Sequence, residues 1–400
     1  MFKKVLLSLA ISIFLVTPAS AKMKYWSSHQ VTTTGSQTWT YYRDIVITNQ
    51  TAGTLTDYQV KLEIPYDSDM QTDFDDIRIT DISNVLLSGQ WRETYTASGT
   101  ETRFVKISTI LPSGSVTIRM HYGNASANLV SSVTNTFVRE INGAQPLKGA
   151  WNLDEGSGTT ANDTSGNGNN GTLLPAGTGP TWTTGKFGNA LSFDGTDDYV
   201  EFSDNSATDF GATDSFTFLL WVKTNQTPSW EARFITFRVG GSQPLIDIGV
   251  NSNGTFGLQR ARSSSGSGDE VGLSTTNSYN NGQWHHFAVV RDVPADKFRL
   301  YVDANLDGEK IDSTTGHFDT VTKRLGFYYD GQYYNGLIDE VQIYKSALTA
   351  AEISDLYGTG GDRHGYTTTN YPGRVLVRNY ASPEPTYTIG SGEFTSSYSE

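Results

Sequence analysis

Residues 303–308, Asp-Ala-Asn-Leu-Asp-Gly, carry the side chains that open a calcium-binding loop. In such a loop, oxygen-bearing side chains alternate, a glycine follows, and a glutamate at the twelfth position supplies two oxygens. Here the twelfth position is Thr314, and residues 297–302 alternate polar with apolar side chains, as a strand does. Asn-Leu-Asp-Gly at 305–308 also favours a turn. The stretch therefore predicts a hairpin, and a metal site must be sought elsewhere.

Catalytic motifs are absent from the sequence. It contains neither the E-x-D-x-x-E run of retaining glycanases, nor the HExxH of metalloproteases, nor the G-x-S-x-G elbow. His285 and His286 are adjacent in a strand-like run, so their rings point to opposite faces and cannot act together on one substrate. The sequence therefore predicts a protein without catalytic activity. Carboxylates that meet across strands leave a glycan hydrolase or lyase as an alternative.

Short alternating runs between turn residues dominate the chain, which contains 40 glycines, and they predict an all-β fold. Residues 57–65 and 116–122 are examples, each with one apolar and one polar face. His121 falls on the polar face of the second run, where we expect it to be solvated.

The first residues have the three parts of a secretory signal. Lys3 and Lys4 precede an apolar run at 5–16, and Ala-Ser-Ala follows at 19–21. We expect residues 1–21 to be removed, so that the protein is secreted, either extracellular or on a cell surface. No later apolar run approaches membrane-spanning length.

The composition excludes several classes of function. The net charge of −13 argues against nucleic acid and anionic membranes as partners. The chain has no cysteine, so disulfides and thiol chemistry are excluded.

Residues 22–140 predict an N-terminal β-sandwich of unknown function. The segments YYRDIVITNQTAGTLTDYQVKLEI, DFDDIRITD, GQWRETY and HYGN follow one another in this part. In this order they resemble the domain-of-unknown-function 2341 family. The resemblance implies a β-domain but no known chemistry.

Residues 141–358 predict a second antiparallel sandwich. The segments GKFGNALSFDGTDDYVEF, FTFLLWVKT, QWHHFAVVRD, RLYVD and NGLIDEVQIYKSALTAAEISDLY occur here in order. The series resembles the laminin-G-like, concanavalin A-like lectin/glucanase jelly roll, which implies two curved antiparallel sheets packed face to face.

The end of the second domain and the tail carry further local signals. Thr349 and Glu352 form a capping box, which predicts a short helix at 350–357 that closes the domain. The tail, residues 359–400, is predicted to be extended with one strand at 374–379. The sequence leaves open whether this tail docks on the N-terminal domain.

Asp339 is the main candidate for a metal ligand. Strand alternation places this carboxylate on the face of Leu337, Val341 and Ile343, where it requires a cation or several N–H donors. The resemblance implies that an aspartate here helps to hold a structural calcium ion, with Asp163 and Gly195 as further ligands. The alternative is that Asp339 caps a turn through hydrogen bonds alone.

Exposed aromatic residues are the candidates for sugar binding, because pyranose rings stack on flat aromatic faces. Trp230, Tyr329 and Tyr333 lie in turn-rich segments. Tyr334 matches a position that a core phenylalanine usually fills in the jelly-roll family that this domain resembles. We therefore expect a non-catalytic carbohydrate- or glycoprotein-binding module with a role in adhesion. A structural component of a cell surface or appendage is the alternative.

Overall fold

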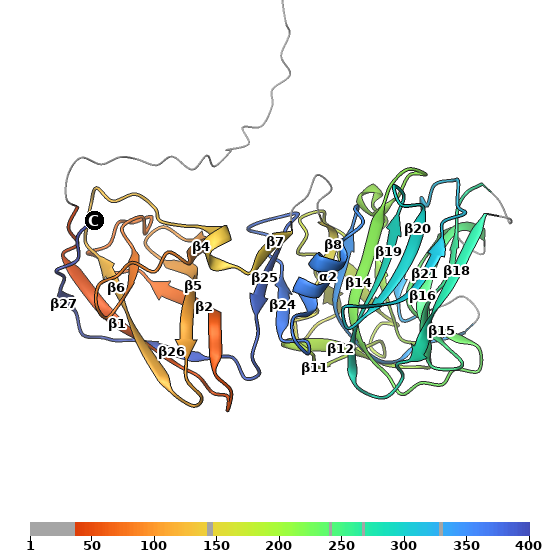
Figure 1. Ribbon diagram of the computed structural model, residues 1–400, viewed down its shortest axis with the longest axis horizontal. Coiled ribbons are helices and arrows are strands. Elements are labelled where there is room, and N and C mark those ends of the chain that lie inside the picture. Colours follow the sequence, from red (N-terminus) through yellow and green to blue (C-terminus); the bar gives the residue numbers. More distant parts are fainter. Residues whose placement is uncertain (1–36, 142–146, 240–241, 266–268, 328–330) are drawn as a thin grey trace, which may run out of the picture. The chain divides into compact units, whose positions relative to one another are not determined.

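The regular secondary structure of the computed structural model is almost entirely strand (Figure 1), and the predicted all-β class is confirmed. It describes residues 37–141, 147–239, 242–265, 269–327 and 331–400. The expected signal peptide, residues 1–21, lies outside them. The helical segments are α1 (Val133–Thr136), a 3-10 turn (Ser206–Thr208) and α2 (Ala350–Tyr357).

Two antiparallel sheets form the N-terminal sandwich. The first has the strand order β26-β1-β6-β3, with β27 also paired to β1, and the second has the order β2-β5-β4. The bounds are β1 (Tyr41–Thr48), β2 (Leu55–Pro65), β3 (Arg78–Asp81), β4 (Gln90–Tyr95), β5 (Thr100–Ile110), β6 (Ser115–Tyr122), β26 (Thr386–Ile389) and β27 (Phe394–Thr395). The strands predicted at 57–65 and 116–122 are therefore present as β2 and β6.

Two larger antiparallel sheets form the jelly roll. One has the order β18-β17-β16-β15-β22-β13-β10-β9, and we call it the front sheet. Its strands are β9 (Thr160–Ala161), β10 (Gly171–Leu174), β13 (Tyr199–Phe202), β15 (Glu231–Val239), β16 (Ser242–Asn251), β17 (Thr255–Arg262), β18 (Glu270–Ser278) and β22 (Thr322–Leu325).

The other sheet, which we call the back sheet, has the order β11-β12-β23-β14-β19-β20-β21, with β8 paired to β23. Its strands are β8 (Leu147–Trp151), β11 (Thr181–Thr184), β12 (Asn189–Asp194), β14 (Phe216–Lys223), β19 (Trp284–Asp292), β20 (Lys297–Val302), β21 (Asn305–Ile311) and β23 (Asn335–Tyr344).

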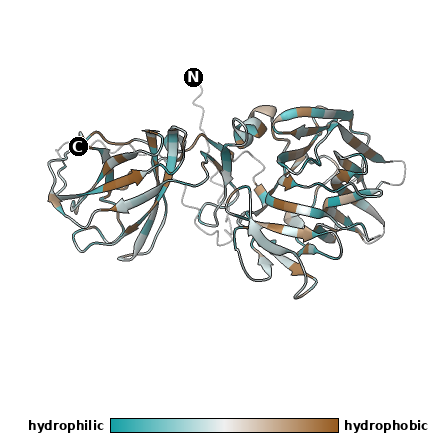
Figure 2. Ribbon diagram, turned by 90° about the horizontal axis from the view of Figure 1, so that it is seen from below, coloured by the Kyte–Doolittle hydropathy of each residue, from teal (hydrophilic) through white to brown (hydrophobic). Residues whose placement is uncertain are grey.

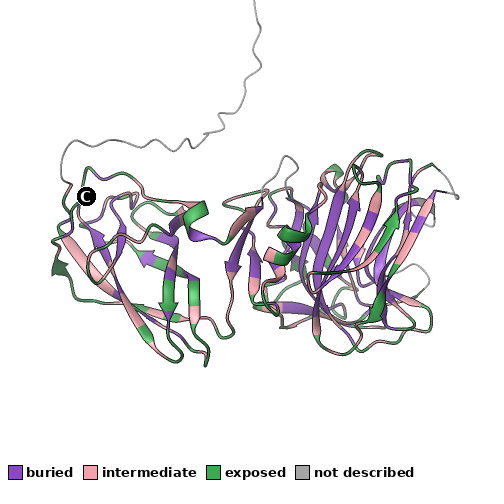
Figure 3. Ribbon diagram, viewed as in Figure 1, coloured by how far each residue is buried: buried purple, intermediate pink, exposed green. Residues whose placement is uncertain are grey.

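The core of the jelly roll lies between these two sheets, where alternate residues of both meet. Apolar and polar residues alternate along the strands (Figure 2), and the strands are largely buried whereas the loops are more exposed (Figure 3). Tyr334 belongs to this core, as its sequence position predicts.

A second apolar cluster covers the outer face of the back sheet. Leu219, Val290 and Tyr344 point outward from β14, β19 and β23 and pack against Ile353 and Leu356 of α2. The predicted capping box of α2 is present, since Thr349 and Glu352 each accept a hydrogen bond from the backbone N–H of the other. The helix therefore closes one face of the jelly roll.

The C-terminal segment contains more structure than the single predicted strand. β25 (Val375–Asn379) lies near that prediction, and it pairs with β24 (Arg363–Tyr366) on one side and β7 (Arg139–Ile141) on the other. β26 and β27 then pair with β1. The tail thus docks on the N-terminal sandwich, which settles the question that the sequence left open.

The hairpin predicted from residues 303–308 is present, but its turn lies earlier. β20 pairs antiparallel with β21, and Val302 lies opposite Asn305. Asp303 and Ala304 both have positive φ, 51° and 65°, so they form the two-residue turn. Asn305 to Gly308 instead belong to β21, which has a register irregularity at this point.

His121 is buried, so the expectation that it is solvated is wrong. Its Nε2 lies 2.9 Å from Thr80 Oγ1 and its Nδ1 lies 2.7 Å from Ser396 Oγ. The ring also packs on Tyr398. The polar face of β6 at this position is therefore covered by the returning C-terminal segment, a tertiary contact that strand alternation does not reveal.

Acid is expected to loosen this docked segment. Burial lowers the pKa of His121 from 6.5 to about 4. The unfolded chain therefore binds this proton more tightly, and the free energy of unfolding decreases as the pH falls from about 6.5 toward about 4. Limited proteolysis across this range should release C-terminal peptides progressively faster. The same experiment on His121→Gln should show a weaker pH dependence, and equal slopes for both proteins would contradict the prediction.

Candidate functional site

Asp339 lies next to a β-bulge, which changes the face that the sequence pattern assigns to it. Opposite Leu219 and Trp221 of β14, the register passes from Gln342 to Asp339, so β23 contains one extra residue. Glu340 is that residue and has a φ of 50°. Val341 and Ile343 consequently belong to the inner core, whereas Asp339 lies opposite Trp221 on the outer face. The prediction that Asp339 shares their face is wrong.

The two oxygens of Asp339 have different surroundings. Its Oδ2 accepts hydrogen bonds from the backbone N–H groups of Lys186 at 2.8 Å and Phe187 at 3.0 Å. Its Oδ1 is buried and has no hydrogen-bond partner among the described residues. Burial, and next the neighbouring carboxylate of Glu340, raises the pKa of Asp339. A buried oxygen without a donor fits the calcium site that the resemblance implies.

Asp163 has no free coordination position of this kind. Its Oδ1 accepts from the backbone N–H groups of Ala150 and Ser165, and its Oδ2 accepts from the backbone and side-chain N–H groups of Asn169. Four donors therefore already satisfy its carboxylate. Asp163 folds the loop that follows β9, and the geometry does not offer it to a cation.

The structure does not bring Asp163, Gly195 and Asp339 together. Asp163 is bonded to Ala150, which lies opposite Gln342 on β23. Gly195 instead lies against Asn335, at the other end of β23. At about 3.3 Å per residue these two places are roughly 20 Å apart, far more than one ion can bridge. If calcium binds at Asp339, its other ligands come from elsewhere.

A row of polar side chains crosses the outer face of the front sheet. Cross-strand pairing aligns neighbouring strands in the order β17, β16, β15, β22 and β13. The residues in this row are Arg260, Asp247, Thr236, Arg324 and Glu201. Phe237 and Ile246, the neighbours along the strands, belong to the core on the inner face. The row therefore contrasts with the apolar outer face of the back sheet.

Asp247 organises the middle of this row. It has no exposed surface, and its Oδ2 lies 3.8 Å from Arg233 Nε and 3.7 Å from Arg260 Nε. Burial raises the pKa of its carboxyl, although the charges of Arg233, Arg238 and Arg260 oppose this shift. Because Asp247 is enclosed, it does not present itself to a ligand. It orients the guanidinium groups around it.

Three aromatic rings lie near the Arg324 and Glu201 end of the row, where β22 ends and β13 begins. The ring of Phe327 lies 5.3 Å from that of Tyr199 and 5.1 Å from that of Tyr333. The Arg324 guanidinium lies 4.7 Å from the Tyr199 ring centroid, and Arg324 Nε donates to Glu201 at 2.7 Å. These half-buried rings with their charged neighbours form what we call the aromatic platform.

Trp230 lies at the same end of the front sheet. β15 runs antiparallel to β22, with Ile235 opposite Leu325, so the chain leaving β22 toward Phe327 runs toward the start of β15. Trp230 immediately precedes β15 and is 68% exposed. Of the three predicted sugar-binding residues, Tyr333 and Trp230 therefore lie at one end of the sheet, and Tyr329 lies outside the described residues.

Sequence reasoning missed Tyr199 and Phe327. The alternation of Tyr199 and Glu201 with Val200 and Phe202 could have placed the first two on an outer face. No local pattern pairs β13 with β22, however, and this pairing is what brings Tyr199 to Phe327.

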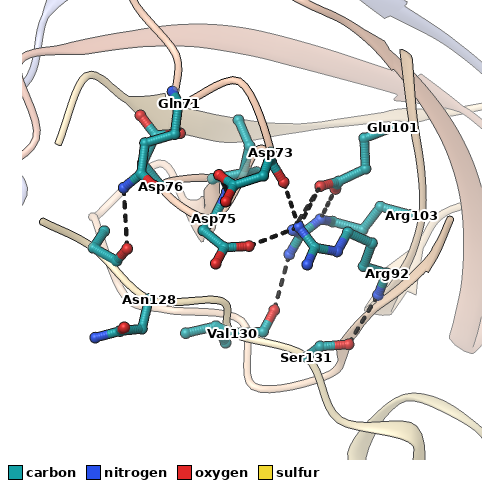
Figure 4. A network of polar contacts seen from close by, with 12 residues as sticks. Gln71, Asp73, Asp75, Asp76, Arg92, Glu101, Arg103, Asn128, Val130 and Ser131 are labelled. Atoms are coloured by element: carbon teal, nitrogen blue, oxygen red, sulfur yellow. Dashed lines mark hydrogen bonds and ion pairs between the residues drawn. The ribbon is translucent and has the colours of Figure 1, made fainter. Parts of the chain in front are cut away.

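The motif DFDDIRI of the N-terminal sandwich supports an ionic network (Figure 4). Arg92 Nη1 donates to Asp75 Oδ1 at 2.8 Å, and the Arg103 guanidinium pairs with the buried carboxylate of Glu101. Arg103 Nη1 also donates to Gln90 Oε1 at 2.8 Å and to the Val130 carbonyl at 3.1 Å. Burial raises the pKa of Glu101, while Arg103 opposes the shift. These contacts link strands to loops, which is a structural role.

The fold and its motifs define the two domains of the chain. Residues 194–354 match the family model described as the concanavalin A-like lectin/glucanases superfamily, and residues 73–153 match that of domain of unknown function DUF2341. The chain therefore has a DUF2341 domain followed by a concanavalin A-like lectin/glucanase domain, and both predicted resemblances are confirmed. No protein of curated function matches it.

Solved structures resemble about half of the chain. The binding domain of Paraclostridial Mosquitocidal Protein 1 is 15% identical, with a TM-score of 0.44, over 53% of this chain and 51% of its own. The chain thus spans about half the length of that structure. Domain 4 of AbnA, a GH43 extracellular arabinanase from Geobacillus stearothermophilus, was solved with arabinotriose. It is 21% identical, with a TM-score of 0.41, and the match covers 53% of this chain and 98% of that domain.

The Botulinum neurotoxin serotype G binding domain is 12% identical, with a TM-score of 0.44, and the match covers 53% of this chain and 50% of that structure. At these scores the likenesses carry no argument about function. Within the described residues, no helix has the length and apolar character needed to cross a membrane.

Calcium is expected to stabilise the jelly roll through Asp339. A ligand that binds only the folded state contributes about 2.7 kcal/mol at a hundred times its dissociation constant. Added calcium should therefore raise the melting temperature by a few degrees, and a chelator should reverse the rise. Asp339→Asn should reduce the rise, because the amide oxygen still accepts from Lys186 and Phe187 but the charge is lost.

Asp307→Asn is the control. Asp307 lies in β21 and accepts a hydrogen bond from the Tyr279 hydroxyl, so its variant should retain the calcium-dependent rise. A melting temperature that does not respond to calcium in the parent protein would contradict the Asp339 site.

Proposed function

We propose that the protein is an exported, non-catalytic module that binds carbohydrate through the end of the front sheet. The observation that carries this proposal is the aromatic platform of Tyr199, Phe327 and Tyr333, with the Arg324–Glu201 pair beside it and exposed Trp230 at the same sheet end. A glycan, free or on a glycoprotein, is the partner that this chemistry fits, which is compatible with a role in adhesion.

The arrangement matches the two surfaces of a sugar ring. The C–H groups of a pyranose face pack on an aromatic ring, and its hydroxyls accept from a guanidinium and donate to a carboxylate. Glu201 retains 42% exposure of its side chain beside the half-buried rings. One sugar could therefore stack on a ring of the platform and hydrogen-bond to the Arg324–Glu201 pair.

The two sheets of the jelly roll differ in what their outer faces can do. The back sheet uses its outer face to pack α2 and β25 in an apolar cluster. No hydrophobic cluster of the described residues includes the polar row of the front sheet. At the β13 and β22 end of this row, the side chains of Glu201 and Arg324 are partly exposed and therefore open to a ligand.

A non-catalytic role is supported by the position of the carboxylates. Asp247, whose raised pKa would suit an acid catalyst, has no exposed surface. Glu201, whose side chain is 42% exposed, is paired with the Arg324 guanidinium. Neither group is placed as the acid of a glycosidase requires.

A structural component of a cell surface is the second candidate. It is favoured by the course of the C-terminal segment, which forms a separate sheet with β7 through β24 and β25 and then adds β26 and β27 to β1 of the N-terminal sandwich. Such a connection suits a building block of a larger assembly. This role does not require a sugar.

A glycan array is expected to identify a ligand, with dissociation constants on the order of micromolar to millimolar because the platform is shallow. Removing one stacking ring by Tyr333→Ala or Trp230→Ala should cost about 1 kcal/mol, which is roughly a fivefold to tenfold loss of affinity. For Trp230, which is exposed, the melting temperature should change little.

Leu306→Ala is the matched control, since Leu306 is 52% exposed on β21 of the back sheet. It should leave glycan affinity unchanged. If no glycan binds the parent protein, or if Tyr333→Ala and Trp230→Ala bind glycan as the parent does, the platform is not the binding site and the structural role becomes the better explanation.

A further inference from the structure

The turn between β12 and β13 gathers three carboxylates. Asp194, Asp197 and Asp198 each place one carboxylate oxygen within 4.8 Å of the other two. The turn is tight, because Gly195 has a φ of +80° and a Cβ there would lie 2.9 Å from the Cβ of Asn335. Three like charges are thus held close together by the backbone.

Asp198 supplies an independent sign that something is bound here. Only 3% of this residue is exposed. Its Oδ2 accepts from the backbone N–H of Asp194 at 2.8 Å, whereas its Oδ1 is buried and has no hydrogen-bond donor among the described residues. An ionised oxygen buried without a donor is unfavourable unless a cation neutralises it.

A second acidic group of the same size shows how the chain neutralises such charges elsewhere. Asp67, Asp69 and Glu393 also come within 4.8 Å of one another, but the Arg43 guanidinium lies 2.6 Å from Asp67 and 3.9 Å from Glu393. Among the ion pairs of the described residues, none brings a lysine or arginine to the turn at 194–198. The turn therefore lacks a protein cation of its own.

We propose that Asp194, Asp197 and Asp198 bind a calcium ion. The turn offers only oxygen ligands, carboxylates and backbone carbonyls, which is the set that this hard cation prefers. The site differs from the one at Asp339, since Asp194 lies opposite Asn335, at the beginning of β23. The turn directly precedes Tyr199, so a bound ion would fix the start of β13. The proposal of a calcium site does not depend on glycan binding.

Terbium luminescence on the full chain tests the site without any sugar. Tb³⁺ replaces Ca²⁺ on oxygen ligands, and Tyr199 is the adjacent aromatic group that can sensitise it. Titration should give a saturable signal that Ca²⁺ displaces. Asp198→Asn, which keeps an oxygen to accept from Asp194 but loses the charge, should weaken Ca²⁺ binding at least tenfold.

Two controls separate this site from other carboxylates. Asp69→Asn, in the group that Arg43 neutralises, should leave the signal unchanged. Asp339→Asn, at the other candidate site, should leave the part of the signal that Asp198→Asn weakens. If Asp198→Asn does not fold, as judged by circular dichroism, the half-buried Asp197→Asn decides with the same expected loss. The proposal is overturned if the foldable variants of Asp197 and Asp198 bind Ca²⁺ like the parent, or if the parent gives no displaceable signal.

Discussion

The bulge in β23 is the constraint on which much of the second domain depends. In a regular strand, Asp339 and Glu340 would point to opposite faces, and one of them would enter the apolar core. The extra residue at Glu340 lets Ile338 and Val341 both face inward. Asp339 then binds the backbone at Lys186 and Phe187.

The second carboxylate of the bulge extends the same constraint to the C-terminal segment. Glu340 Oε1 lies 2.9 Å from Nε2 of His364 on β24. β24 pairs with β25, where Arg378 binds Glu384, and Glu384 accepts from the hydroxyl of Tyr58 in β2. A chain of polar contacts thus runs from the centre of the back sheet to the N-terminal sandwich. Because Glu340, His364 and Arg378 are buried, the loss of one partner would leave another uncompensated.

Much of this fold follows from local sequence signals, because those signals act within a few residues. The capping box of Thr349 and Glu352 predicts α2, and alternation predicts β2 and β6. What the sequence does not reveal are positions where the backbone departs from its local preference. The turn at Asp303 and Ala304 and the bulge at Glu340 place residues other than glycine at positive φ. The pairing of the surrounding strands imposes these conformations.

In the candidate site too, some residues can be predicted from local sequence and others only from tertiary contacts. Trp230 and Tyr333 are predictable, because exposed aromatic residues in turns are unusual on their own. Tyr199 and Phe327 complete the platform only through the pairing of β13 with β22, and His121 is buried only because the tail returns to β1. Such contacts join residues that are distant in the chain, and no pattern within one segment encodes them.

Antiparallel order explains why these features meet at one end of the jelly roll. The turn from β12 to β13, the exit of β22 and the entry to β15 all lie at the same edge, since Val200 and Ile235 both pair with Leu325. The backbone bond from Tyr334 N–H to the Gly326 carbonyl brings the start of β23 to this edge as well. Turn chemistry there is free to vary without disturbing the core between the sheets. The aromatic rings, the Arg324–Glu201 pair and the three aspartates are therefore additions to a scaffold whose stability resides elsewhere.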